Sequence, residues 1–154
     1  MLNPGSVTDA FAATLVSIPS LNDAMQGRIS AFHYLLGQEH RLAEAIYKMP
    51  APSMFVAWDG TLGGNFDGQT IWKHRFNVYF RMGNAAGQAD PVGYEDLWWI
   101  VCNKSPAGSQ VSIRYMQLYP GLDIMDTPSV AHALDEDQID RFVGTFVIPE
   151  IGDN

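Results

Sequence analysis

The stretch IWKHRFNVYFRM, residues 71–82, decides the fold class of this chain. Side chains along it alternate between two kinds of surroundings, which is the period of a β-strand. One face carries Trp72, His74, Phe76, Val78, Phe80 and Met82, and the other carries Lys73, Arg75, Asn77, Tyr79 and Arg81. We therefore expect a long strand with one face buried in a core.

Other segments also carry strand patterns. Residues 54–58 are apolar throughout and predict a strand that is buried on both faces or lies at a subunit contact. Residues 111–118 and 139–148 predict two further strands, and a short one is expected around residues 130–134. The glycine-rich segments 59–68 and 83–93 are predicted to be loops.

Helical spacing appears before and after the first strands. Residues 3–18 predict a helix that ends before Pro19. A second helix is expected from Ser20 onward, because Met25, Ile29, Phe32 and Leu36 form one stripe. Residues 39–49 predict a third helix, and residues 94–101 a fourth. The single cysteine, Cys102, follows this last pattern as a small packed hydrophobe.

This order of elements predicts an α+β fold. Most connections between strands are too short for parallel crossovers, so the sheet is expected to be mainly antiparallel, with four or more strands and helices packed on one face. The length of 154 residues suits one domain. Residues 1–49 are expected to form a helical N-terminal part, and residues 50–154 the sheet and one helix.

Charge and composition exclude several classes of protein. The net charge is −8, and residues 118–154 carry eight acids against Arg141 alone, a local net charge of −7. Such a segment argues against binding of nucleic acid phosphates. It suits a surface that repels DNA, binds a basic partner or aids solubility. No apolar run approaches the ~20 residues of a membrane span. We expect no membrane contact, no secretory signal and a reducing compartment.

No pattern of catalytic or metal-binding residues emerges. The histidines His33, His40, His74 and His132 lack zinc-ligand spacing, and His74 is expected to be a hydrogen-bonded histidine in the core or an interface. Segment 59–68 matches neither a phosphate-binding nor a calcium-binding loop. Acids at 135–140 are interpreted as a solvated turn. We therefore expect no enzymatic activity and no cofactor.

Charged and aromatic residues mark a candidate subunit interface. The basic face of the long strand can contact nucleic acid, or pair head-to-tail with the acidic C-terminal segment of a neighbour. Trp99 is turned away from the buried stripe that Trp98 joins, as an interface anchor would be. The candidate interface residues are Lys73, Arg75, Arg81, Trp99, Asp135, Asp137 and Asp140.

The order of these segments resembles a known family. N-terminal helices precede the proline-flanked strand PAPSMFVAW at 50–58, the long strand at 71–82, the helix at 94–101 and the last strand RFVGTFVIPE at 141–150. This layout is similar to that of the tail terminator (tail completion or minor tail) proteins of long-tailed bacteriophages. The resemblance lies in size and element order over about residues 5–150.

The resemblance implies a structural protein of the virion, assembled in the host cytoplasm. It implies a homohexameric ring that caps the head-proximal end of the tail tube and offers a surface to the neck or connector protein. DNA would be passing cargo only, and the ring would hold no cofactor. Segments 59–69 and 83–93 are expected to reach neighbouring subunits.

Two other classes stay open at this point, beside a neck or head-closure protein of the same virion. One is a small host binding module whose basic strand face meets an acidic ligand. The other is a hydrolase that uses Asp59, His74 or the acids at 135–140.

Overall fold

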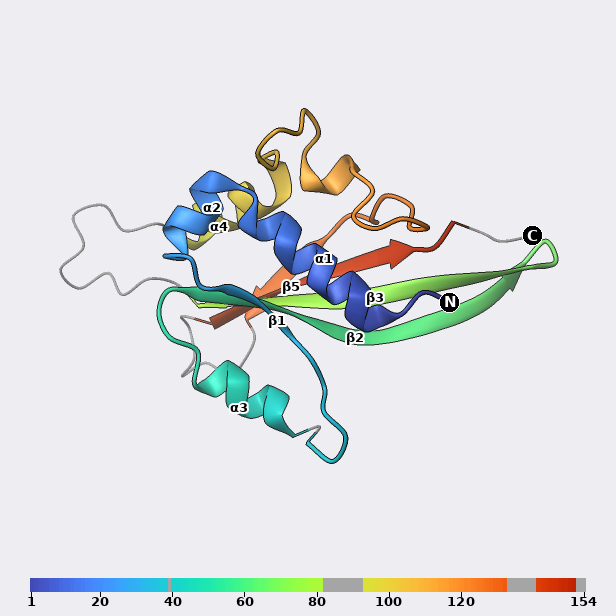
Figure 1. The fold of residues 1–154 in the computed structure, drawn as a ribbon, viewed down its shortest axis with the longest axis horizontal. Helices are drawn as coiled ribbons and strands as arrows, with labels where there is room; N and C mark the ends of the chain where they lie inside the picture. Colours follow the sequence, from blue (N-terminus) through green and yellow to red (C-terminus); the bar gives the residue numbers. More distant parts are fainter. Residues whose placement is uncertain (39, 82–92, 133–140, 152–154) are drawn as a thin grey trace.

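The computed structural model describes residues 1–38, 40–81, 93–132 and 141–151 (Figure 1). In chain order the elements are α1 (Pro4–Val16), α2 (Pro19–Ala24), β1 (Ile29–Phe32), α3 (Arg41–Tyr47), β2 (Ser53–Phe66), β3 (Gln69–Arg81), α4 (Tyr94–Asn103), the 3-10 helix η1 (Ile113–Tyr115), β4 (Ser129–His132) and β5 (Arg141–Pro149). The predicted α+β class is confirmed.

The five strands form one sheet in the order β1-β2-β3-β5-β4. Every pairing is antiparallel except that of β1 with β2, which is parallel. The predicted long strand is β3, at the centre of the sheet. Its alternation holds, because His74, Phe76, Val78 and Phe80 are fully buried whereas Lys73 and Arg75 are exposed.

The main core lies between the sheet and the helices α1, α2 and α4, on what we call the first face (Figure 1). Phe11 of α1 packs edge-on against Phe146 of β5, with ring centroids 5.1 Å apart. Trp98 of α4 lies so close to Gly144 of β5 that a Cβ atom there would come 2.5 Å from the indole. A glycine at this position therefore allows α4 to approach the sheet.

Helix α3 lies on the opposite, second face of the sheet. It packs Ile46, with the following Met49, against Phe55 of β2 and Tyr79 of β3 in a smaller cluster of their own. The expectation that all helices lie on one face therefore holds for three helices and is wrong for α3. The reason is that β2 is apolar on both faces, so its second face also needs a cover.

The predicted second helix is much shorter than expected. Helix α2 ends at Ala24, and both Gln26 (φ 53°) and Gly27 (φ 74°) take left-handed conformations that a helix cannot continue. Ile29 and Phe32 then belong to β1, although their spacing matches a helical stripe. Pairing with β2 thus prevails over that pattern, and residues 1–49 are not wholly helical.

Two other segments differ from their predictions. Residues 59–66 continue β2, so the hairpin turn is confined to Asp67 and Gly68, both with positive φ as two-residue hairpin turns require. Segment 111–118 forms η1 and irregular chain in place of a strand. The predicted short strand is present as β4 and the last strand as β5, whereas loop 83–92 lies outside the described residues.

The close approach of Trp98 to Gly144 gives a stability prediction. Replacing Gly144→Ala should lower the free energy of unfolding by about 1–3 kcal/mol, because the new methyl group forces α4 away from the sheet. Urea denaturation measures this change. Gly64→Ala is the matched control, since a Cβ there meets nothing within 4 Å and should cost little. Equal stability of the two variants would contradict this account of α4 packing.

Candidate functional site

Lys73 and Arg75, two members of the predicted basic stripe, are exposed on the second face. The Nζ atom of Lys73 lies 3.8 Å from Oδ2 of Asp126, and Nη1 of Arg75 lies 3.7 Å from Oδ2 of Asp59. All four side chains are at least 40% exposed, and such ion pairs contribute about 0–1 kcal/mol. Both cations are therefore accessible to a partner but already face a carboxylate of their own chain.

Arg81, the third member of the stripe, holds α3 on the sheet. Its Nη1 donates to the carbonyl oxygen of Met49 at 2.6 Å. Arg141, opposite it on β5, donates from Nε to the carbonyl of Ile46 and from Nη2 to that of Tyr47, at 3.1 and 3.0 Å. Carbonyls at a helix C-terminus lack helical partners and attract cations. The structure thus gives Arg81 an intramolecular role and divides the stripe.

The part of the second face beyond α3 is mostly polar, with Lys73 and Arg75 exposed and its other residues partly buried. Asn77 and Thr145 lie side by side there, with the Thr145 hydroxyl donating to Oδ1 of Asn77 at 3.1 Å. Lys73, Arg75 and Val147 continue this surface. We call these five residues the open face. The open face is the part of the predicted basic strand face that a partner can contact.

A bulge in β2 borders the open face. Trp58 pairs with Phe76 and Thr61 with His74, so Asp59 and Gly60 together stand opposite Arg75. Gly60 has a φ of 117°, which favours glycine. A groove of about 360 Å³ lies at the bulge, lined by Asp59, Gly60, Thr61, Leu62, Lys73, Arg75 and Val147.

The far end of the β2–β3 hairpin extends past the other strands as an arm, residues 62–71 (Figure 1). Pairing of β1 with β2 ends at Ala57, and pairing of β5 with β3 ends at Lys73. From residue 64 to residue 71 the arm is thus a two-stranded ribbon, which is marginally stable without a third strand or a covering surface. Leu62 lies at its base, opposite Lys73. Its Leu62 side chain is 74% exposed.

Trp99 lies on α4, over the first face of the sheet. Its side chain is 54% exposed, which agrees with the prediction that it turns away from the buried stripe. Lys104 places its Nζ atom 4.9 Å from the centre of the indole ring. Trp99 and the open face therefore do not form one surface. Asp135, Asp137 and Asp140, the acidic members of the predicted interface, lie outside the described residues.

His74 is a hydrogen-bonded core histidine, as expected. It is fully buried, and its Nε2 lies 2.7 Å from Oε1 of Glu150 while its Nδ1 lies 2.7 Å from the Thr61 hydroxyl. That hydroxyl accepts a hydrogen bond from Nε1 of Trp58 at 3.0 Å, so its own proton is available to Nδ1. A neutral imidazole with its proton on Nε2 then donates to Glu150 and accepts from Thr61, so that both ring nitrogens are hydrogen-bonded.

Glu150 completes this network by joining both ends of the chain. Its Oε1 also accepts the backbone N–H of Leu2 at 2.5 Å. Burial by itself would raise the pKa of Glu150, but the hydrogen bonds from Leu2 and His74 and the positive charge of the N-terminal amine outweigh it. The pKa of Glu150 is therefore lowered, and the carboxylate is held ionised.

Little in this arrangement supports the hydrolase alternative. Asp59 faces Arg75 on the second face, whereas His74 points into the first face, so the two do not meet. Within the described ranges, no three His, Cys, Asp or Glu side chains gather as metal ligands would. Burial raises the pKa of the Cys102 thiol to about 11, which opposes its use as a nucleophile.

Several residues of these sites carry no sequence signal. Thr61 meets His74 only through strand register, and Glu150 meets it across 76 residues of chain. Lys104 and Arg114 are isolated cations in the sequence, and the fold brings both near α4. The doublet of Gly60 with Asp59 could have indicated a bulge, since glycine within a strand pattern often marks one.

Neither the scan against family models nor the search of curated proteins finds a match to this chain. In the described part of the chain, no helix has the length and apolar character needed to cross a membrane.

The buried network predicts a pH-dependent stability. Because the folded-state pKa of Glu150 is lowered, its contribution is present above the unfolded-state value near 4.5 and is lost as pH falls through the folded-state value. At pH 7, Glu150→Gln should lower the free energy of unfolding by roughly 1–3 kcal/mol. Urea denaturation at pH 7 and at about pH 3 should show this difference shrink at the lower pH.

The exposed Glu44→Gln is the control for this experiment. It should leave stability nearly unchanged at both pH values. A Glu150→Gln variant that is as stable as the control at pH 7 would contradict the assigned role of the carboxylate.

Proposed function

We propose that this protein is a structural subunit of a tailed-phage virion, a tail terminator that assembles into a ring on the head-proximal end of the tail tube. The element order found in the sequence supports this proposal through its resemblance to that family. The fold agrees with the small α+β subunit that the resemblance implies. In this proposal the ring is a hexamer that contacts the tube protein on one side and the neck protein on the other.

The single observation that carries the proposal is the bare arm. A two-stranded ribbon with an exposed leucine at its base gains stability when another protein surface covers it. An arm that extends past its own sheet is suited to reach a neighbouring subunit or the tube.

The open face and Trp99 add two further contact surfaces. They lie on opposite faces of the sheet, so one subunit can contact different partners at the same time. A ring that caps a tube needs this property, because each subunit meets two neighbours and the proteins above and below it.

The arm gives a prediction for assembly. Leu62→Glu should leave thermal stability unchanged, because the side chain is exposed, and should weaken assembly at least tenfold by placing a charge in the contact. Native mass spectrometry over a concentration series, with negative-stain images in the presence of tail tubes, measures assembly. Rings of six 17.0 kDa chains on tube ends are the expected product of the unaltered protein.

Val111→Glu is the matched control, since Val111 is also an exposed aliphatic residue but lies away from the arm. It should assemble normally. Failure of the unaltered chain to bind tube ends at any concentration would reject the terminator proposal. Normal assembly of Leu62→Glu would reject the role of the arm alone.

A further inference from the structure

A second groove lies between α4 and η1, about 330 Å³ in volume. Its walls are mostly aromatic and apolar, with one acid and one base. Its lining includes Glu95, Trp98, Trp99, Cys102, Arg114 and Pro128. Lys104 stands at the same place through its contact with the Trp99 ring.

The two cations of this groove differ from those of the open face. Lys104 and Arg114 form no ion pair with a carboxylate of the described residues, and each instead lies over an aromatic ring. The guanidinium carbon of Arg114 is 5.4 Å from the ring centre of Tyr115, which is 61% exposed. A protein with a net charge of −8 thus keeps two cations without an ion-pair partner among the described residues beside two exposed aromatic rings.

The groove is held rigidly by the core beneath it. Trp98 stacks on Phe80 of the central strand, with an interplanar angle of 9°, and presses against Gly144 of β5. Leu97 and Val101 bury the same side of α4. A rigid patch of Trp, Tyr and Arg loses little entropy on binding, and these residue types dominate the energy of interfaces.

A complementary segment exists in the same chain. Residues 133–140, ALDEDQID, carry four carboxylates together with two aliphatic side chains, Leu134 and Ile139. The segment leaves β4 at His132 and enters β5 at Arg141. Eight residues anchored at both ends reach at most about 14 Å from the strand ends, which is enough to enter a groove on an adjacent molecule.

We propose that the α4–η1 groove binds the acidic segment 133–140 of a second copy of this chain. Lys104 and Arg114 pair with its carboxylates, and Trp99 packs against its aliphatic side chains. This inference rests on the proposed ring and names the contact between its neighbours. It assigns the acidic segment to the unpaired cations of the groove, because Lys73 and Arg75 already face Asp126 and Asp59.

The groove favours an acidic peptide over a nucleic acid. Aromatic rings beside cations can also stack bases, but a phosphate backbone needs a longer basic track. Here Glu95 lines the groove and Asp96 follows it in the first turn of α4. A polyphosphate chain spreads its charge over many nucleotides, whereas the acidic segment confines four carboxylates to six residues, a length that two neighbouring cations can match.

The test is binding of a fluorescein-labelled peptide of residues 133–140 to the full chain, followed by fluorescence polarisation. The receptor carries Asp135→Asn, Asp137→Asn and Asp140→Asn, so that its own segment does not compete. We expect binding to weaken at least tenfold with Trp99→Ala and to be lost with Lys104→Glu and Arg114→Glu combined. Added salt should also weaken binding, since the charges are exposed.

Matched controls separate this groove from the open face. Lys73→Glu and Arg75→Glu should leave peptide binding unchanged, and circular dichroism should show every variant folded. A peptide with all four acids replaced by amides should not bind. Absence of binding, loss of binding only in the Lys73 and Arg75 variants, or displacement of the peptide by an eight-nucleotide single strand would each overturn the proposal.

A mixing experiment shows whether the contact joins two copies. One variant keeps the acidic segment but carries Trp99→Ala with Lys104→Glu, and the other keeps the groove but lacks the three aspartates. Each should stay monomeric alone, and the mixture should give a 1:1 dimer in native mass spectrometry. A mixture that stays monomeric would mean that the segment fills the groove of its own chain, which overturns the proposal.

Failure of this inference and failure of the terminator proposal give different results. If Trp99→Ala still forms rings on tube ends, the groove contact is rejected and the terminator proposal stands. If the peptide binds but no rings form on tube ends, the terminator proposal is rejected and the groove contact stands.

Discussion

The antiparallel pairing of β2 with β3 is the constraint on which the rest of the structure depends. It sets two apolar surfaces back to back, because Met54 and Val56 face the main core while Phe55 and Ala57 face α3. It also carries the bulge that brings Thr61 to His74, and it continues into the arm. Both layers of helices, the buried polar network and the proposed contact surface are therefore consequences of one hairpin.

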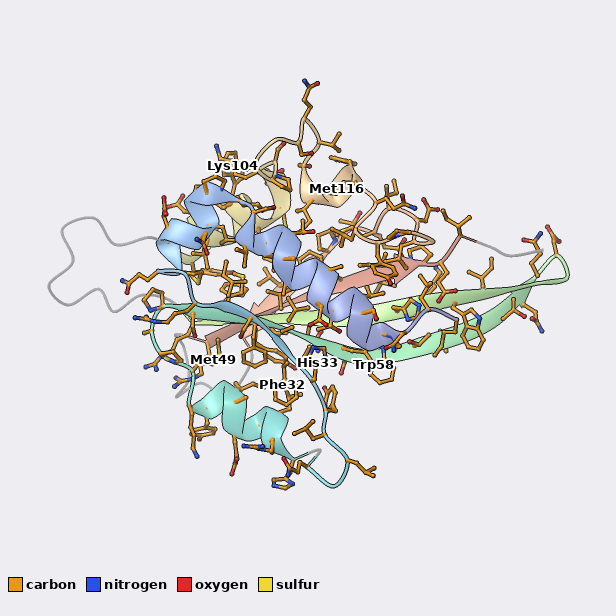
Figure 2. The ribbon with its side chains drawn as sticks, viewed as in Figure 1. Phe32, His33, Met49, Trp58, Lys104 and Met116 are labelled. Carbon is orange, nitrogen blue, oxygen red and sulfur yellow. The ribbon has the colours of Figure 1, made fainter. Side chains whose placement is uncertain are left out.

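The cations of this acidic protein fall into groups with different roles. Arg81 and Arg141 stabilise the C-terminal end of α3, and Lys73 and Arg75 face carboxylates across the open face. In the groove at α4, cations that lack an ionic partner among the described residues lie over exposed aromatic rings (Figure 2 labels Lys104). Counting charges along the chain cannot separate these roles, because each depends on which carbonyl, carboxylate or ring the fold places nearby.

Sequence pattern predicts the parts of this fold whose periodicity reflects burial on one side. The alternation through His74, Phe76, Val78 and Phe80 identifies β3, and the helical spacing of Leu97 and Val101 identifies α4. It fails where tertiary pairing decides. Ile29 and Phe32 have helical spacing but form the edge strand β1, and the glycines that predict a loop at 59–68 instead belong to a long hairpin.

The candidate sites show the same division. Exposure of Trp99 follows from its position beside Trp98 on a helix, so the sequence is sufficient to predict it. The roles of Arg81 and Glu150 are not predictable in this way, because α3 and the N-terminus reach them from distant parts of the chain.

The hydrogen bond between Leu2 and Glu150 spans 148 residues and has a consequence for how the protein unfolds. Leu2 precedes α1 and Glu150 follows β5, and the two elements also pack together where Phe11 contacts Phe146 and Phe76. Release of Leu2 or of Glu150 takes a hydrogen bond away from the carboxylate that holds the buried His74. Hydrogen exchange at the first helix and the last strand should therefore report a single cooperative opening.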